Sequence, residues 1–315
     1  MLGPLIGIIV ALIIIAAIVL LAFSYWRARE LVKPLRKPLD YLPEDVGLPV
    51  EDVRLRGPRG TLAAWFVPPL NGCTLICCHG INDNRGQWVR QVARLRERSG
   101  YGALMLDFAG HGMSEGSKVT YGPREADDVA AALEYLRTRE EVDINRVGIM
   151  GYSLGAITSV LAAVHLPELA CVVIESGFTD LYDDISTLFT RYTGLPSFPF
   201  AALIVFMGQV LSGVKLHKIR PAHIIGQLSP RAVLIISDLK DAIANEPEDG
   251  NRLYANAREP RELWQVAEAG HVQAFEVFPD EWTDRVCMFL DTHLGKLPQP
   301  RTVESVEDAR LAGND

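Results

Sequence analysis

The chain has 315 residues, of which 49% are hydrophobic and 22% charged, a composition typical of folded rather than disordered proteins. Its net charge is −8, and residues 38–315 carry 26 cations against 38 acids. A domain this acidic is not expected to bind nucleic acid, which requires a cationic surface. The five cysteines show no paired spacing, so neither a disulfide framework nor a zinc site is expected.

The first 26 residues differ from the rest of the chain because they contain no charged side chain. Residues 5–23 are almost entirely aliphatic, and a helix of that length spans roughly 28 Å, the thickness of the hydrocarbon core of a bilayer. Tyr25 and Trp26 follow at the position of an interfacial aromatic belt. Residues 1–26 are therefore predicted to be a transmembrane anchor.

A cleaved signal peptide is the alternative interpretation of this segment. It requires cations before a shorter apolar run and a small-residue cleavage site after it. Here the cations follow the run instead, at Arg27, Arg29, Lys33, Arg36 and Lys37. By the positive-inside rule they place the rest of the chain in the cytoplasm. We therefore expect a single-pass membrane protein with a cytoplasmic domain.

The segment that follows the anchor, residues 27–49, is basic and rich in proline, and we interpret it as a semi-rigid spacer. Because the first strand is expected only at residue 50, the domain is predicted to fold without residues 1–37. Residues 295–315 are polar and lack apolar periodicity, which predicts a disordered tail. The folded domain is assigned to residues 50–294.

Strand and helix patterns alternate along this domain. Alternation of this kind predicts βαβ units and a mostly parallel sheet of about eight strands, with helices on both faces. Residues 50–54 and 62–67 are predicted to open the sheet as a hairpin. Apolar runs predict the further strands at 74–78, 103–108, 147–152, 171–174, 232–237 and 263–266. Helical spacing predicts helices at 87–98, 124–137, 156–165, 249–258 and 280–293.

The strongest chemical signal is the run GYSLG at residues 151–155. A strand is predicted before it and a helix after it, which is the context of a nucleophile elbow. Glycines flank Ser153 because the turn from strand to helix is too tight for side chains beside it. A chance GxSxG in a glycine-rich chain is the alternative, and the flanking elements argue against it.

A serine nucleophile needs a histidine base and a carboxylate that orients it, and in this fold class they follow in the order acid, then histidine. His271 lies in a loop after the strand predicted at 263–266, which favours it over the six other histidines. Asp241 follows the strand at 232–237 and is the preferred acid. Asp180, after the strand ending at Ile174, is the alternative acid, whereas Asp238 lies too near its strand end.

Acyl transfer also needs N–H donors for the oxyanion of the tetrahedral intermediate. The elbow supplies the backbone N–H of Leu154. The loop after the strand at 74–78 reads His79-Gly80-Ile81, and the N–H of Ile81 is the expected second donor. The cysteines are weak rival nucleophiles, since they lie in apolar runs and are expected in the core.

With these motifs, residues 50–294 resemble the serine α/β-hydrolases, and are most similar to the membrane-associated Bem46-like hydrolases of the serine aminopeptidase type. The resemblance rests on residues 78–85, 107–114, 151–155 and 175–180, on Asp241 and on Gly270-His271. It implies a Ser153–His271–Asp241 triad, no metal and no organic cofactor, and a structural turn at 107–114. Two positions depart from the pattern: Ser237-Asp238 replaces a His-Gly pair, and Asn245 replaces a proline.

Residues 180–222 interrupt the sheet pattern where this superfamily inserts its cap. Residues 193–214 contain no charge and many large apolar side chains. A second membrane span is excluded because it would put Ser153 and His271 on opposite sides of the bilayer. The segment is expected to form an apolar lid or lip that touches lipid, or else a cap helix packed on the core.

These observations predict a membrane-anchored hydrolase that cleaves a carboxylic ester or thioester of medium- to long-chain acyl groups. The alternatives are a peptidase or amidase of the serine aminopeptidase type and a non-catalytic hydrolase-like scaffold at the membrane. The expected partners are a small acyl ester or lipid substrate and the membrane itself.

Overall fold

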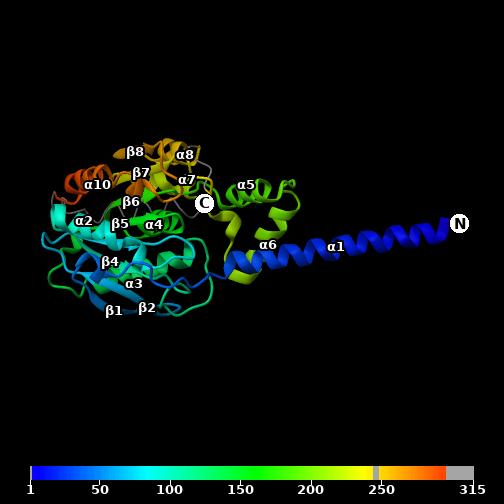
Figure 1. Ribbon diagram of the computed structural model, residues 1–315, viewed down its shortest axis with the longest axis horizontal. Helices are drawn as coiled ribbons and strands as arrows, with labels where there is room; N and C mark the ends of the chain where they lie inside the picture. The colour runs from blue at the N-terminus through cyan, green and yellow to red at the C-terminus, as the bar shows by residue number, and fades with distance from the viewer. Residues whose placement is uncertain (1, 244–247, 296–315) are drawn as a thin grey trace, which may run out of the picture.

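A single twisted sheet forms the centre of the domain in the computed structural model, which describes residues 2–243 and 248–295 (Figure 1). The strand order is β1-β2-β4-β3-β5-β6-β7-β8. Strand β2 is antiparallel to both β1 and β4, and the other neighbours are parallel. The strands are β1 Glu51–Gly57, β2 Gly60–Val67, β3 Thr74–Cys78, β4 Gly102–Leu106, β5 Val147–Tyr152, β6 Leu169–Glu175, β7 Ala232–Asp238 and β8 Arg261–Val266.

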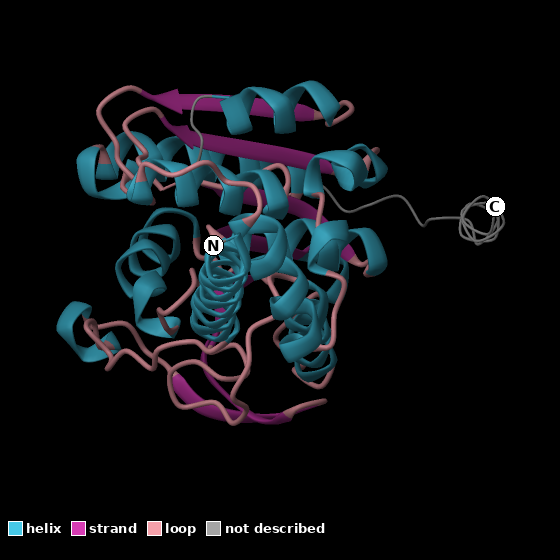
Figure 2. Cartoon of the chain, turned by 90° about the vertical axis from the view of Figure 1, so that its right-hand side faces the viewer, coloured by secondary structure: helices cyan, strands magenta, loops and turns pink. Residues whose placement is uncertain are grey.

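Helices cover both faces of this sheet, so the central strands are buried on both sides (Figure 2). In β3, for example, Leu75 and Cys77 pack into one core, whereas Ile76 and Cys78 pack into the other. Alternate side chains of a strand point to opposite faces, which is why the run reads as continuously apolar. One face carries α3 Pro123–Leu136, α4 Leu154–His165 and α8 Glu248–Asn256, and the other carries α2 Val89–Ser99, α9 Ala274–Val277 and α10 Pro279–His293.

The predicted α/β fold class is confirmed, and the predicted strands agree with the observed ones to within three residues at either end. The cap, in contrast, contains helices that the sequence pattern did not resolve. They are α5 Leu181–Thr193, α6 Phe200–Ser212 and the short α7 Pro221–Ile224. Short 3₁₀ helices cover Pro43–Val46, Arg85–Trp88, Ile144–Arg146, Leu216–Lys218 and Ile225–Leu228. The tail predicted to be disordered lies outside the described residues from 296 onward.

The N-terminal helix α1 runs from Leu2 to Val32, six residues beyond the predicted anchor. In the described part of the chain it is the one helix long and apolar enough to cross a bilayer. Its last turns pack beside α6, where Ala28 and Val32 are buried. A Cβ on Gly208 of α6 would lie 3.5 Å from Leu31 and 3.8 Å from Val32, so the two helices approach closely there.

The residues after α1 also contact the domain, which corrects their interpretation as a spacer. The Leu35 N–H donates to Asn82 Oδ1 over 2.7 Å, and Asn84 Nδ2 donates to the carbonyls of Lys37 and Pro38. The Arg36 guanidinium donates to three carbonyls in the 111–116 turn. Hydrogen-bond donors and acceptors that a free spacer would leave to water are paired with the domain here. The end of α1 and residues 35–38 are therefore docked on the domain, whereas residues 4–22 are largely exposed.

Truncation tests this docking. We expect a chain lacking residues 1–37 to unfold at a temperature roughly 6–12 °C lower than a chain lacking residues 1–21. The loss of two buried side chains and the Arg36 hydrogen bonds removes about 3 kcal/mol or more. Thermal unfolding followed by circular dichroism in one detergent buffer measures the difference. Equal melting temperatures for the two truncated chains would contradict the docking.

Candidate active site

Ser153 occupies the turn between β5 and α4, with φ 51° and ψ −113°. This backbone conformation is strained for a residue with a side chain, and such strain is concentrated at functional sites. Both flanking glycines are required by close approach. A Cβ on Gly151 would lie 2.1 Å from the Gly155 carbonyl oxygen, and a Cβ on Gly155 would lie 2.0 Å from the Cys78 carbonyl oxygen. The motif therefore forms the sharp elbow predicted for it.

The loop after β3 lies against this serine. A Cβ on Gly80 would be 3.6 Å from Ser153 Cβ, so the backbone of the loop reaches the nucleophile directly. His79 is buried, and its Nε2 accepts the Phe108 N–H over 3.0 Å. Nδ1 therefore carries the proton and donates to the Gly80 carbonyl over 2.7 Å.

This hydrogen bond determines the direction of the next peptide group. The C=O and N–H of a trans peptide point in opposite directions, so the Gly80 carbonyl on His79 turns the Ile81 N–H away from the imidazole. Burial lowers the pKa of His79, which keeps it neutral and able to both accept and donate. Leu154 begins α4, and the N–H groups of a first helical turn have no partner within the helix.

The structure brings His271 and Asp241 together. His271 Nδ1 donates to Asp241 Oδ2 over 2.6 Å, and the Asp241 side chain is buried. The second carboxylate oxygen, Oδ1, accepts the N–H of Ile243 over 2.7 Å, which holds the acid in place. Ser153, Asp241 and His271 follow β5, β7 and β8, whose carboxyl ends meet at one edge of the parallel sheet. Asn245, the second departure from the family pattern, lies outside the described residues.

The alternative acid, Asp180, has another role. It caps α5, where its Oδ1 accepts the N–H groups of Tyr182 and Asp183, and its Oδ2 pairs with Arg220 over 2.7 Å. The five cysteines are all buried, as expected for core residues. Burial raises the pKa of the Cys77 thiol well above its usual value, which disfavours the thiolate that a nucleophile requires.

The loop that carries His271 is held by residues whose role the sequence analysis did not predict. Its successive backbone N–H groups at positions 272, 273 and 274 donate to Ser176 Oγ, Asp238 Oδ2 and Glu175 Oε1. Ser176 Oγ also donates to Asp238 over 2.8 Å, and Trp282 Nε1 donates to Glu175. The sequence did contain one sign of this role, since Ser237-Asp238 stands where the family pattern has His-Gly. A buried acid at the end of a strand needs hydrogen-bond partners, and these could have been sought.

Glu175 and Asp238 form a buried pair of carboxyl groups. Burial raises the pKa of Glu175 well above its usual value, and the neighbouring Asp238 raises it further. Burial also raises the pKa of Asp238, although its hydrogen bonds to Ser176 and the Gln273 N–H act in the opposite direction. Two like charges this deeply buried are unfavourable, so the pair retains a proton on Glu175.

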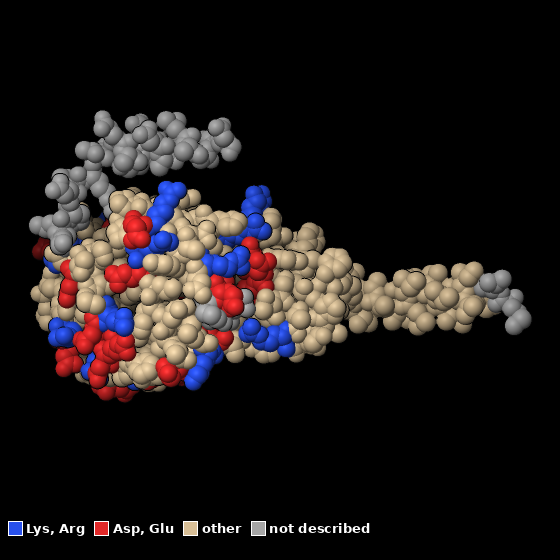
Figure 3. All heavy atoms as spheres, turned by 90° about the horizontal axis from the view of Figure 1, so that it is seen from above, with Lys and Arg blue, Asp and Glu red and all other residues tan. Residues whose placement is uncertain are grey.

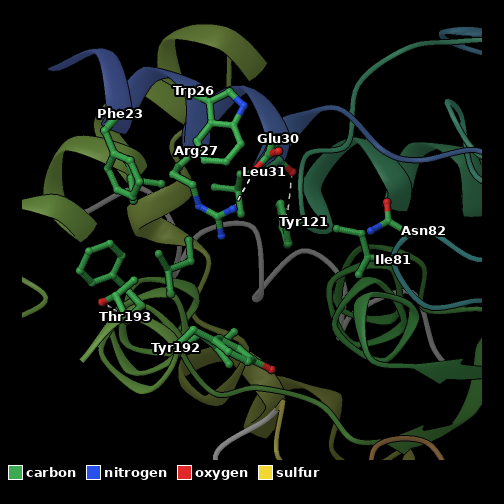
Figure 4. A pocket seen from close by; sticks show the side chains of 14 residues that line it. Phe23, Trp26, Arg27, Glu30, Leu31, Ile81, Asn82, Tyr121, Tyr192 and Thr193 are labelled. Atoms are coloured by element: carbon green, nitrogen blue, oxygen red, sulfur yellow. Dashed lines mark hydrogen bonds and ion pairs between the residues drawn. The ribbon is translucent and has the colours of Figure 1, made fainter. Parts of the chain in front are cut away.

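A cavity of about 500 Å³ opens beside the loop after β3 (Figure 4). Ile81 and Asn82 line it on the side of this loop, and Ile81 directly follows Gly80, where an added Cβ would lie 3.6 Å from Ser153 Cβ. Its walls are mostly apolar and come from α1, α5 and α6 together with Tyr121; they are Phe23, Trp26, Arg27, Glu30, Leu31, Ile185, Leu188, Phe189, Tyr192, Thr193 and Ile204. A cavity of this size falls within the usual range for small-molecule sites, about 300–1,000 Å³.

Known proteins resemble the chain in both sequence and fold. Residues 77–215 match the X-Pro dipeptidyl-peptidase (S15 family). The uncharacterized protein YfhR of Salmonella typhimurium is 29% identical over 255 residues, 78% of this chain and 82% of that protein. The α/β-hydrolase domain-containing protein WAV2 of Arabidopsis thaliana is 29% identical over 154 residues, 47% of this chain and 49% of that protein.

Among solved structures, an esterase from Pyrococcus furiosus superposes with a TM-score of 0.70 at 24% identity, covering 84% of this chain and 99% of that one. An esterase from Exiguobacterium antarcticum gives a TM-score of 0.59 at 16% identity, covering 76% of this chain and all of that one. The chain shares the α/β-hydrolase fold with these proteins.

The proton on Glu175 predicts a pH dependence of stability. A carboxyl whose pKa is raised by folding stabilises the native state fully below about pH 4.5, and this contribution is lost as the pH rises toward its folded pKa. Glu175→Gln keeps the site neutral at every pH. We therefore expect the free energy of unfolding of this variant to fall less between pH 5 and 8 than that of the unsubstituted chain. The difference between the two slopes is expected to be up to about 1.4 kcal/mol per pH unit.

Urea unfolding at several pH values measures this effect, with the exposed Glu97→Gln as the matched control. Parallel pH dependence in Glu175→Gln and the unsubstituted chain would contradict a retained proton.

Proposed function

We propose that this chain, a member of the α/β-hydrolase superfamily, is a membrane-anchored serine hydrolase that cleaves a carboxylic ester or thioester. The observation that carries the proposal is the 2.6 Å contact between His271 and Asp241, at the sheet edge that also holds the strained Ser153 elbow. A paired imidazole and carboxylate at the same sheet edge as a half-buried serine are the parts that nucleophilic acyl transfer needs.

In the proposed mechanism, Ser153 Oγ attacks the carbonyl carbon while His271 Nε2 takes the hydroxyl proton. Asp241 holds the imidazole in the required tautomer and stabilises the imidazolium that forms. The N–H groups of Ile81 and Leu154 stabilise the oxyanion. The imidazolium then protonates the departing alcohol or thiol, leaving an acyl group on Ser153. Water, activated by His271 in the same way, releases the acid and restores the serine.

The cavity supports an acyl substrate over a peptide. An aminopeptidase needs acidic groups for the ammonium of its substrate, and Glu30 is the one carboxylate among the described residues that line the cavity. Glu30 is already paired with Arg27 over 2.7 Å. Apolar walls instead favour alkyl chains by about 0.8 kcal/mol for each buried CH₂. The match to the S15 peptidase family keeps amide cleavage as the second candidate.

The packing of α1 supports a retained membrane anchor. A signal peptide leaves the mature protein, whereas the end of α1 is part of the folded domain, with Ala28 and Val32 buried in it. Removal would expose the apolar surface that these residues cover. The cations Arg27, Arg29 and Lys33 on the domain side favour a cytoplasmic domain.

Substitution of the proposed triad tests the mechanism. We expect Ser153→Ala to abolish labelling by a fluorophosphonate, and Asp241→Asn to lower kcat about 10⁴-fold through the wrong imidazole tautomer. Asp180→Asn is the matched control, because an asparagine still caps α5 and should leave kcat within a few-fold. A labelled peptide containing another serine, or a larger loss from Asp180→Asn, would show that the site is wrongly assigned.

Chain-length selectivity tests the substrate class. We expect kcat/KM to rise with acyl length from two carbons toward medium and long chains, by up to about fourfold per CH₂ while the cavity fills. Neutral or zwitterionic substrates should be preferred, because the acidic domain repels anions. Steady-state kinetics with esters of two to sixteen carbons measure this. Acetyl esters or peptides cleaved as well as long-chain esters would argue for the second candidate.

A further inference from the structure

The cavity beside the loop after β3 has an unusual wall, because part of it is the proposed membrane helix itself. Five lining residues belong to the last third of α1, from Phe23 to Leu31. Tyr192 of α5 faces them from the opposite side in Figure 4, and Leu188 of the same helix also lines the cavity. A pocket between an anchor helix and a cap helix is complete only when the anchor is present.

The outer end of this cavity lies at the expected edge of the bilayer. Phe23 ends the uncharged aliphatic run of α1, and Trp26 follows it on the interfacial side. The cap reaches the same level, since the Phe23 ring lies 6.4 Å from that of Phe189 and 6.0 Å from that of Phe200. The turn that joins α5 to α6 is therefore at the depth where lipid chains begin.

The surface of the cap at this depth is suited to lipid. Residues 193–214 carry no charge, and the end of the domain next to α1 is uncharged in Figure 3. Large apolar side chains project from it into the surroundings; they are Tyr192, Leu195, Phe198, Phe206 and Val210, which we term the cap patch. Large exposed apolar side chains concentrated in one short segment indicate a membrane or partner contact.

We infer that the cavity is an acyl-chain site that fills sideways from the bilayer, with one lipid acyl chain as its occupant. This inference rests on the proposed function and specifies its substrate as an ester that resides in the membrane. The chain passes between α1 and α5, its apolar part along Phe23, Leu188 and Ile204. Its carbonyl reaches Ile81, the cavity residue next to Gly80 and the proposed oxyanion donor.

The polar groups of the cavity suit such a substrate. Arg27 and Glu30 form an ion pair on α1, about one and two turns beyond Phe23, at the level expected for the headgroup region. The polar head of a lipid drawn into the cavity would meet this pair, and its chain would meet walls that are mostly apolar. A water-soluble ester gains nothing from this arrangement, because its route to Ser153 need not cross the cap patch.

The first experiment narrows the cavity in the full chain, reconstituted in phosphatidylcholine vesicles. Leu188→Trp fills the space between α5 and α1, and Met288→Trp on the exposed face of α10 is the matched control. The readout is the ratio of kcat/KM for p-nitrophenyl palmitate to that for p-nitrophenyl butyrate. We expect this ratio to fall at least tenfold in Leu188→Trp and to stay unchanged in Met288→Trp. An unchanged ratio in both variants would overturn the acyl-chain site.

The second experiment tests entry from the bilayer. Phe198→Asp introduces a charge into the cap patch. The control is Leu70→Asp, in the loop between β2 and β3, because Leu70 is 72% exposed and Phe198 is 76% exposed. The readout is the rate of p-nitrophenyl palmitate hydrolysis in vesicles divided by the rate in detergent micelles. We expect Phe198→Asp to lower this ratio at least fivefold more than Leu70→Asp does. Equal effects of the two variants would show that the chain enters from water.

Failure of the proposed function gives a different result. An unsubstituted chain that hydrolyses neither ester and takes no fluorophosphonate label on Ser153 would overturn both the function and the inference. A chain that takes the label and hydrolyses both esters, but whose ratios do not respond to Leu188→Trp or Phe198→Asp, retains the function and loses the inference.

Discussion

The contact between the start of α4 and the end of β3 is the constraint on which the site depends. Gly155 packs so closely on the Cys78 carbonyl that no side chain fits between them. This contact forces the sharp turn at Ser153 and brings the loop after β3 to the serine. The His79 hydrogen bond then orients the Ile81 peptide. The nucleophile and one proposed oxyanion donor are thus placed by backbone packing, and backbone packing is rigid.

Helix α1, the proposed membrane anchor, is linked to the same loop. Its end packs on α6, and the next residues hold the loop after β3 through the Leu35 N–H on Asn82 and through Asn84 on two carbonyls. The proposed oxyanion loop therefore receives contacts from a segment only a few residues beyond the anchor. A displacement of α1 relative to the domain would move the groups that hold Asn82, whereas the buried elbow would stay in place.

Local pattern predicted the sheet and the elbow, because both depend on short-range features. Thr74–Cys78 and Val147–Tyr152 are apolar runs with turn signals at their ends, and their observed bounds equal the predicted ones. The docking of residues 27–38 was not predicted. A segment of prolines and cations between an anchor and a domain has the same sequence pattern whether it is a free linker or is packed on the domain. The role of Glu175 was missed for a related reason. Its partners Asp238 and Ala274 are distant in sequence and meet only in the fold.

The proposed anchor is docked on the domain, which has a physical consequence that a free spacer would lack. A flexible linker raises the local concentration of membrane substrates but leaves the domain free to turn, so each encounter must find the right orientation. With α1 packed on the cap as the proposed anchor, the orientation of the cavity relative to the bilayer would be set before a substrate arrives. Bringing an ester and a nucleophile together costs orientational entropy. Part of that cost is then met when the protein folds, which favours the reaction of substrates held in the plane of the bilayer.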